Sequence, residues 1–91
     1  MANVSVEKSA VVKSIALCNR TIQHYKQTAA YMEKQYREAG NGWHDAKYAQ
    51  LGAVVNDCTT ALKSPVAELE DCLRKLNELL KAIERYESEN L

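Results

Sequence analysis

The chain has 91 residues, and 12 Lys plus Arg balance 12 Asp plus Glu, so its formal net charge is zero. A single domain of this length buries only about 60–65% of the surface that its unfolded chain exposes, so its hydrophobic core is thin. A zero net charge argues against nucleic acid or an anionic membrane surface as a partner, because both attract a basic face.

The first half of the chain predicts one long helix, from about residue 5 to about residue 39. Apolar residues recur there at alternating steps of four and three, a heptad pattern that a strand cannot produce. The pattern comprises Val11, Ile15, Cys18, Ile22, Tyr25, Ala29, Met32 and Tyr36. At 1.5 Å per residue, such a helix is about 50 Å long.

The segment Gly40-Asn41-Gly42 predicts a turn, which we place at residues 40–43. Gly is favoured just past a helix end because it adopts left-handed backbone dihedrals without a Cβ clash. Asp45 is expected in the first turn of the next helix, where a carboxylate interacts favourably with the helix dipole. Trp43, the only tryptophan, is expected to form an aromatic cap over this end with Met32, Tyr36 and Tyr48.

The second half predicts another long helix, from about residue 44 to about residue 88. Its stripe of three- and four-residue steps comprises Tyr48, Leu51, Val55, Cys58, Leu62, Pro65, Leu69, Cys72, Leu76, Leu79, Ile83 and Tyr86. Pro65 interrupts this helix, because proline lacks an amide hydrogen and clashes with the preceding turn. We expect a kink there, since the stripe keeps its register, and the alternative is a three-helix bundle with a corner at Ser64.

These elements predict an all-α fold: a single domain, residues 1–91, that forms an antiparallel two-helix hairpin. Two further apolar columns lie beside the main stripes, Leu17–His24–Tyr31 on the first helix and Val66–Leu73–Leu80 on the second. One hairpin cannot hide so much apolar surface, so we expect these six residues to bind a partner and complete a four-helix bundle on dimerisation.

No residue pattern predicts catalysis, a metal or a cofactor, so we expect a binding protein rather than an enzyme. The three cysteines lie on the apolar stripes and form no Cys-x-x-Cys pair, which excludes a zinc signature or a disulfide framework. His24 and His44 lack the neighbours that phosphotransfer or acid–base chemistry needs, so we interpret them as a surface residue and a helix-start residue.

The length, the two long helices and a tryptophan at the central turn resemble the small helical-hairpin proteins of type VII secretion, which are named for a Trp-X-Gly motif. By this resemblance Trp43 is the motif tryptophan, and Asp45 stands where the motif has Gly. Similar Trp-X-Asp turns occur in the helical partners of LXG-type toxins. The resemblance implies pairing with a sister hairpin, a second copy or a toxin's N-terminal domain, and export by an ATP-driven secretion machine.

The C-terminus departs from the family's export signal, a Tyr followed four residues later by Asp or Glu. Tyr86 is followed at that spacing by Asn90. The resemblance still implies a recognition role for Tyr86, and the missing acid fits a chain whose partner supplies or completes the signal.

The sequence shows neither a membrane-spanning segment nor a cleavable signal peptide, and the expected cellular location is based on these two features. No apolar run approaches the roughly 18 residues that cross a bilayer, and the first residues lack the pattern of a cleavable signal peptide. We expect synthesis in the cytoplasm and secretion by a route that reads no such signal. The alternative function is an intracellular coiled-coil adaptor or assembly subunit that never leaves the cell.

Overall fold

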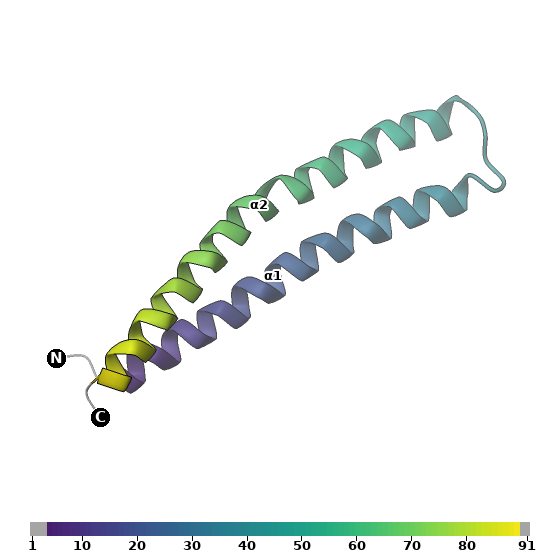
Figure 1. Cartoon of the computed structure of the whole chain (residues 1–91). Helices are drawn as coiled ribbons and strands as arrows, with labels where there is room; N and C mark the ends of the chain where they lie inside the picture. The colour runs from purple at the N-terminus through teal and green to yellow at the C-terminus, as the bar shows by residue number, and fades with distance from the viewer. Residues whose placement is uncertain (1–3, 90–91) are drawn as a thin grey trace. The chain divides into compact units, whose positions relative to one another are not determined.

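The computed structural model describes residues 4–89, with their side chains from residue 6 onward. The fold is an all-α hairpin, in which α1 (Val4–Ala39) and α2 (Ala46–Glu89) are joined by residues 40–45 (Figure 1). The predicted hairpin of two long helices is confirmed. Asn90, where the export signal would have its acidic residue, lies outside the described residues.

The hairpin divides into two compact pairs of helix segments. In the terminal pair, residues up to 22 of α1 pack with residues from 68 onward of α2. In the turn pair, Gln23–Ala67 packs on itself around the turn. Each pair therefore has its own stretch of helix–helix contact.

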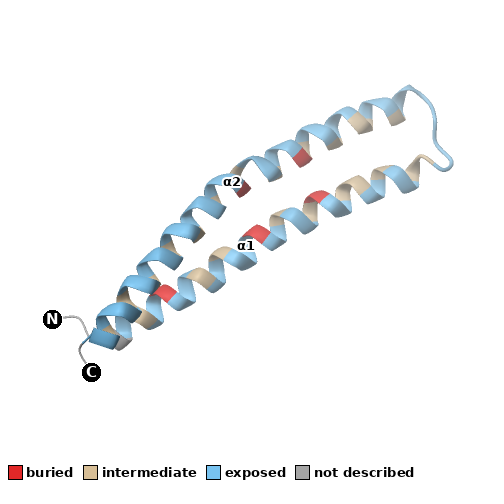
Figure 2. Ribbon diagram, in the orientation of Figure 1, coloured by how far each residue is buried: buried red, intermediate tan, exposed pale blue. Residues whose placement is uncertain are grey.

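The buried face of α1 follows the predicted heptad stripe. Val11, Ile22 and Ala29 are buried, with exposed fractions of 9%, 3% and 0%. The other five stripe residues are half-buried, namely Ile15, Cys18, Tyr25, Met32 and Tyr36 (Figure 2). The stripe is thus a true helix–helix face, but among the described residues it contains no large side chain that is fully buried.

The buried face of α2 differs from the prediction in its C-terminal half. The column Leu69–Leu76–Ile83 is half-buried as expected, whereas Cys72, Leu79 and Tyr86 are exposed. The neighbouring column Leu73–Leu80–Glu87 is half-buried instead of them. Three adjacent apolar columns lie on this part of α2, and contact with one helix covers only two of them.

Pro65 does not end α2, which continues from Ala46 to Glu89 with the proline in its interior. The alternative of a three-helix bundle with a corner at Ser64 is therefore wrong. Pro65 itself is half-buried, and the next residue, Val66, is buried. The helix therefore continues past the proline, although Pro65 has no amide hydrogen to donate to the preceding turn.

No helix within residues 4–89 combines the length and the apolar character that crossing a bilayer requires.

Candidate protein-binding surfaces

The turn is built from backbone hydrogen bonds between residues three or four apart in the sequence, rather than from left-handed glycines. The amide of Gly40 donates to the carbonyls of Tyr36 and Arg37, both at 3.2 Å, and the amide of Gly42 donates to Ala39 at 3.3 Å. No described glycine has a positive φ, so the expected left-handed dihedral is wrong. The bonds to Arg37 and Ala39 span three residues, and such bonds tighten the last turn of a helix and satisfy its free carbonyls.

Asp45 precedes α2 and caps it. Its Oδ1 accepts hydrogen bonds from the amides of Lys47, at 2.9 Å, and Tyr48, at 3.1 Å. This is the N-cap arrangement, in which a side-chain oxygen satisfies amides that have no partner within the helix. The predicted position inside the first turn is thus corrected by one residue, because α2 begins at Ala46 and not at residue 44.

Replacing Asp45 by Ala is expected to lower the free energy of unfolding by about 1 kcal/mol, because two amides lose their acceptor. Urea unfolding followed by circular dichroism measures this change. The matched control, Asp45→Asn, keeps a capping oxygen and should change stability by only a few tenths of a kcal/mol. Equal losses in both variants would contradict a capping role.

An aromatic cluster joins the two helices beside the turn. The rings of Tyr36 and Tyr48 are stacked, with centroids 4.4 Å apart and planes 5° from parallel. Trp43 lies 5.8 Å and His44 lies 6.4 Å from Tyr48, both measured between ring centroids. The Tyr48 hydroxyl also donates to the carbonyl of Tyr36 at 2.9 Å, so the stack is fastened by a hydrogen bond.

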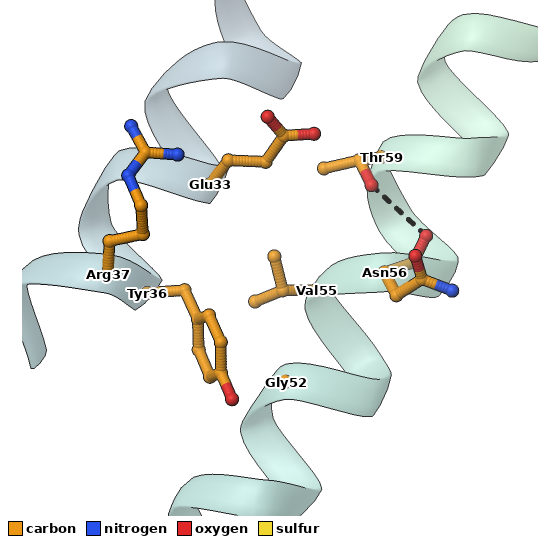
Figure 3. A pocket seen from close by; sticks show the side chains of 7 residues that line it. All are labelled: Glu33, Tyr36, Arg37, Gly52, Val55, Asn56 and Thr59. Carbon is orange, nitrogen blue, oxygen red and sulfur yellow. Dashed lines mark hydrogen bonds between the residues drawn. The ribbon is translucent and has the colours of Figure 1, made fainter. Parts of the chain in front are cut away.

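Two glycines make room for the stacked tyrosines, Gly40 just after α1 and Gly52 within α2. A Cβ at Gly40 would collide with the hydroxyl of Tyr48, and a Cβ at Gly52 would collide with the hydroxyl of Tyr36. Figure 3 shows Tyr36 of α1 beside Gly52 of α2. Each ring thus lies over a glycine on the other side of the hairpin. The role of Gly52 has no local sequence signal, because no turn is nearby.

Replacing Gly52 by Ala is expected to destabilise the protein by about 1 kcal/mol. The new methyl gains about 1 kcal/mol of helix propensity. It would lie only 2.7 Å from Cζ of Tyr36, whose ring is held by the stack, and such overpacking costs about 1–3 kcal/mol. The measurement is urea unfolding, together with near-ultraviolet circular dichroism of the tyrosines.

Gly42→Ala is the matched control for this substitution, because a Cβ at Gly42 meets nothing within 4 Å. It should leave stability within about 0.5 kcal/mol of the wild type. A Gly52→Ala protein more stable than the wild type would show that the stacked tyrosines yield easily.

Alkaline pH should weaken the aromatic cluster. Burial raises the pKa of the Tyr48 hydroxyl above its ordinary value, and its interaction with Tyr36 raises it further. The folded state therefore holds this proton more tightly than the unfolded state, whose tyrosines ionise near about pH 10. Stability from this source is complete below that pH and is lost as the pH rises through the higher folded-state value. The free energy of unfolding, measured by urea titration between neutral and strongly alkaline pH, should fall more steeply for the wild type than for Tyr48→Phe.

The three residues proposed as a partner-binding column on α1 do reach solvent. Leu17 is 58% and Tyr31 is 63% exposed, and His24 is also exposed. Leu17 belongs to the terminal pair and Tyr31 to the turn pair. Both are large apolar side chains on the outside of the hairpin, as a docking residue must be.

The column proposed on α2 lies in the helix–helix contact instead. Val66 is buried, with an exposed fraction of 8%, and Leu73 and Leu80 are half-buried. The prediction that this column is exposed and free to bind a partner is wrong. Its residues continue, at a spacing of seven, the face of α2 that already includes the half-buried Gly52 and the buried Thr59.

The surplus apolar surface of α2 in the terminal pair is the exposed column Cys72–Leu79–Tyr86. Leu79 is 50% and Tyr86 is 56% exposed. Charges lie on the adjacent face, where Arg74 contacts Asp71 at 2.5 Å and Glu78 at 2.8 Å. Hydrogen bonds from Arg74 and Lys75 hold the pKa of Asp71 below its ordinary value.

The cysteines have different surroundings. Cys18 is half-buried, and its thiol donates to the carbonyl of Leu69 at 3.3 Å within the terminal pair. Cys58 is half-buried as well, whereas Cys72 is exposed. The expectation that all three lie on the buried stripes is therefore wrong for Cys72. Residues 4–89 contain no cluster of three or more His, Cys, Asp or Glu arranged to hold a metal ion.

The two sides of the turn pair differ in polarity. One side has a hollow of about 250 Å³ that is lined by charged and polar residues and by residues of the helix–helix contact (Figure 3). The lining is Glu33, Tyr36, Arg37, Gly52, Val55, Asn56 and Thr59. Lys63 pairs with Glu33 there at 3.0 Å, and the Thr59 hydroxyl donates to the Asn56 carbonyl at 3.1 Å.

The other side has a hollow of about 310 Å³, the neutral groove, and no ionisable acid or base at neutral pH lines it. Its lining is Thr28, Tyr31, Met32, Gln35, Tyr36, Leu51 and Val55. Tyr36 and Val55 line both hollows, so the hollows flank the same helix–helix contact. A partner that docks on the neutral groove would not have to desolvate a charge, whereas one on the opposite side would.

No protein family, curated protein or solved structure matches this chain.

Proposed function

We propose that this chain is a protein-binding helical hairpin of a type VII secretion system. It pairs with another helical protein, such as a sister hairpin or the N-terminal helical domain of a toxin, and accompanies that partner to the secretion ATPase. The assignment to secretion rests on the sequence resemblance, above all on Trp43 at the turn. The assignment to protein binding rests on the lack of a sufficient core.

The observation that carries the binding proposal is the surface that the chain leaves in water. The chain exposes 6830 Å². A compact monomer of 10.2 kDa is expected to expose about 5,300 Å², which is about 1,500 Å² less. A standard stable interface buries about 800 Å² per partner, so the excess is large enough for one.

The composition of the buried set supports the same proposal. Among the described residues only Val11, Ile22, Ala29, Val66 and Thr59 are buried. Eight large apolar residues between residues 6 and 89 remain exposed, including Leu17, Tyr31 and Leu79. Most stability of a helix comes from packing its apolar face, so a second helical protein would supply packing that this hairpin lacks.

Trp43 is proposed as part of the recognition surface at the turn. It is 38% exposed and packs against Tyr48 from a turn segment outside both helices. Tryptophans that are partly exposed and rigidly held are frequent in the hot spots of protein interfaces. Trp43→Ala should therefore weaken partner binding more than it weakens the hairpin itself.

The test uses the whole chain, tagged and expressed in its native host. We expect a helical partner to copurify, the purified pair to reassemble from its components, and both proteins to reach the medium only while the secretion ATPase is present. Trp43→Ala should reduce binding and export together. Retention of the protein in cells whether or not the ATPase is present would refute the secretion role and favour the adaptor alternative.

A further inference from the structure

We propose that Cys18 and Cys72 form a reversible disulfide that joins α1 to α2 within the terminal pair. The chemistry needs only this chain and an oxidant, whereas its setting, an oxidising environment reached by export, rests on the proposed function. Disulfides persist outside the cell and are reduced in the cytoplasm, so the bond would distinguish the exported chain from the newly made one.

The observation that carries the proposal is a contact between the Cys18 thiol and α2. The sulfur of Cys18 lies 3.3 Å from the carbonyl oxygen of Leu69, to which the thiol donates a hydrogen bond. Cys72 comes three residues after Leu69 on the same helix, which is less than one turn. All three residues belong to the terminal pair. The two thiols therefore come from opposite helices of one compact unit.

Helix geometry gives the two cysteines a separation that a disulfide can span. The axes of packed helices lie about 8–10 Å apart and Cα atoms lie about 2.3 Å from each axis, so facing residues have Cα atoms about 4–6 Å apart. Along α2, Cys72 lies about 4.5 Å beyond Leu69, and the Leu69 carbonyl projects about 2 Å in that direction. The Cα atoms of Cys18 and Cys72 are therefore about 5–7 Å apart. Disulfides have Cα atoms about 4.4–6.8 Å apart.

The two side chains also tilt toward each other. In an α-helix each Cα–Cβ bond tilts toward the N-terminus of that helix. Because α1 and α2 run in opposite directions, the Cys18 side chain tilts toward the level of Cys72, and the Cys72 side chain tilts back toward the level of Leu69 (Figure 1). Cys18 is half-buried in the helix contact, while Cys72 is exposed, about 60° around α2 from Leu69.

Cys18 can leave its present position at little cost. A thiol is a weak hydrogen-bond donor, so its contact with Leu69 contributes little stability. The Leu69 carbonyl lies in the interior of α2, where it still accepts the helical hydrogen bond from the amide four residues later. A change of rotamer at Cys18 therefore suffices to turn its sulfur from Leu69 toward Cys72.

The oxidant is a small disulfide, and oxidised glutathione represents this class in the test. The thiolate of the exposed Cys72 attacks one sulfur of oxidised glutathione, forms a mixed disulfide and releases one glutathione. The thiolate of Cys18 then attacks the Cys72 sulfur of the mixed disulfide and releases the second glutathione. The two cysteines lose two electrons and two protons in total, and the two glutathione molecules gain them.

The experiment incubates the purified full chain with oxidised glutathione, blocks the remaining thiols and digests the product with trypsin. Each cysteine lies in a different tryptic peptide: Cys18 in residues 14–20, Cys58 in residues 48–63 and Cys72 in residues 64–74. We expect mass spectrometry to find the first peptide linked to the third, within a single chain of 10.2 kDa. The bond closes the loop of residues 18–72, so the melting temperature should rise by about 10 °C or more and return to its former value with dithiothreitol.

Cys58→Ala and Cys72→Ser are the matched variants. Cys58 belongs to the turn pair and lies four helical turns before Cys72, so Cys58→Ala should give the same linked peptides and the same rise. Cys72 is exposed, so Cys72→Ser should fold like the wild type under reducing conditions and show no rise on oxidation. Each rise is measured against the same variant in dithiothreitol, which removes the effect of the substitution on packing.

Four outcomes would overturn the proposal: a linked pair that includes Cys58, a bond between two chains as the main product, a lasting glutathione adduct on Cys72, or a bond that leaves the melting temperature unchanged. Failure of the disulfide and failure of the secretion role are distinguishable. A chain that forms the bond when purified but is never exported disproves only the secretion role, whereas an exported chain in which Cys18 and Cys72 stay reduced disproves only the disulfide.

Discussion

Replacing Ile22 by Ala is expected to lower the free energy of unfolding by about 2–4 kcal/mol, the largest loss from any single truncation in this chain. Ile22 is only 3% exposed, so removal of its outer atoms forfeits buried contacts and leaves a cavity. Buried residues are few here, and a chain of 91 residues has a total stability of about 5–13 kcal/mol. One truncation therefore removes a large share of what holds the hairpin together.

Urea unfolding of the purified chain measures this prediction. For a slope of about 1 kcal/mol per molar urea, the midpoint should fall by about 2 M or more. Leu17→Ala is the matched control, because Leu17 is on the same helix but 58% exposed. Its midpoint should move by about 0.5 M or less at concentrations where the chain is monomeric. Similar shifts for both variants would mean that the helix pairs are not held by the stripe on α1.

The heptad stripe on α1 could be predicted from the sequence because it is the only unbroken apolar column between Val11 and Tyr36. Apolar residues and their spacing agree at every position from Val11 to Tyr36. The flanking column Leu17–His24–Tyr31 is interrupted by the polar His24, so it competes only weakly for burial. The hairpin itself could be predicted for a similar reason, since Gly40 and Gly42 interrupt otherwise continuous helical patterns.

The C-terminal half of α2 could not be predicted in the same way. Cys72, Leu79 and Tyr86 have the same spacing of seven as Leu73 and Leu80, and the two columns are about 100° apart around the helix. Periodicity alone does not say which column faces the other helix. That choice depends on packing against α1, and the structure selects the leucines at 73 and 80.

Three members of the aromatic cluster were predicted, but His44 and the geometry of the cluster were not. Tyr36, Tyr48 and Trp43 are close in any hairpin that closes at the turn. The role of Gly52 depends on where the Tyr36 ring lies across the helix contact, and no local pattern contains that information. For the same reason, Asp45 could be assigned to the helix start but not to its capping hydrogen bonds.

Replacing Pro65 by Ala is expected to raise the free energy of unfolding by about 1–2 kcal/mol, the largest gain from any single substitution. A proline in a helix interior costs about 3 kcal/mol, because it removes a hydrogen bond and clashes with the carbonyl four residues earlier. That carbonyl belongs to Ala61, which is exposed, so water can hydrate it in the wild type. Alanine restores the bond but loses the packing of the half-buried ring, about 1 kcal/mol of apolar contact.

Thermal unfolding tests the balance of these effects. Each 1 kcal/mol shifts the midpoint of a domain this size by about 4–8 °C, so Pro65→Ala should unfold about 5–15 °C higher than the wild type. Ser64→Ala is the control, since Ser64 is exposed beside the proline and its replacement leaves the ring in place. It should shift the midpoint by about 3 °C or less. A lower midpoint for Pro65→Ala, with little change for Ser64→Ala, would mean that the proline ring contributes more through packing than the missing hydrogen bond costs.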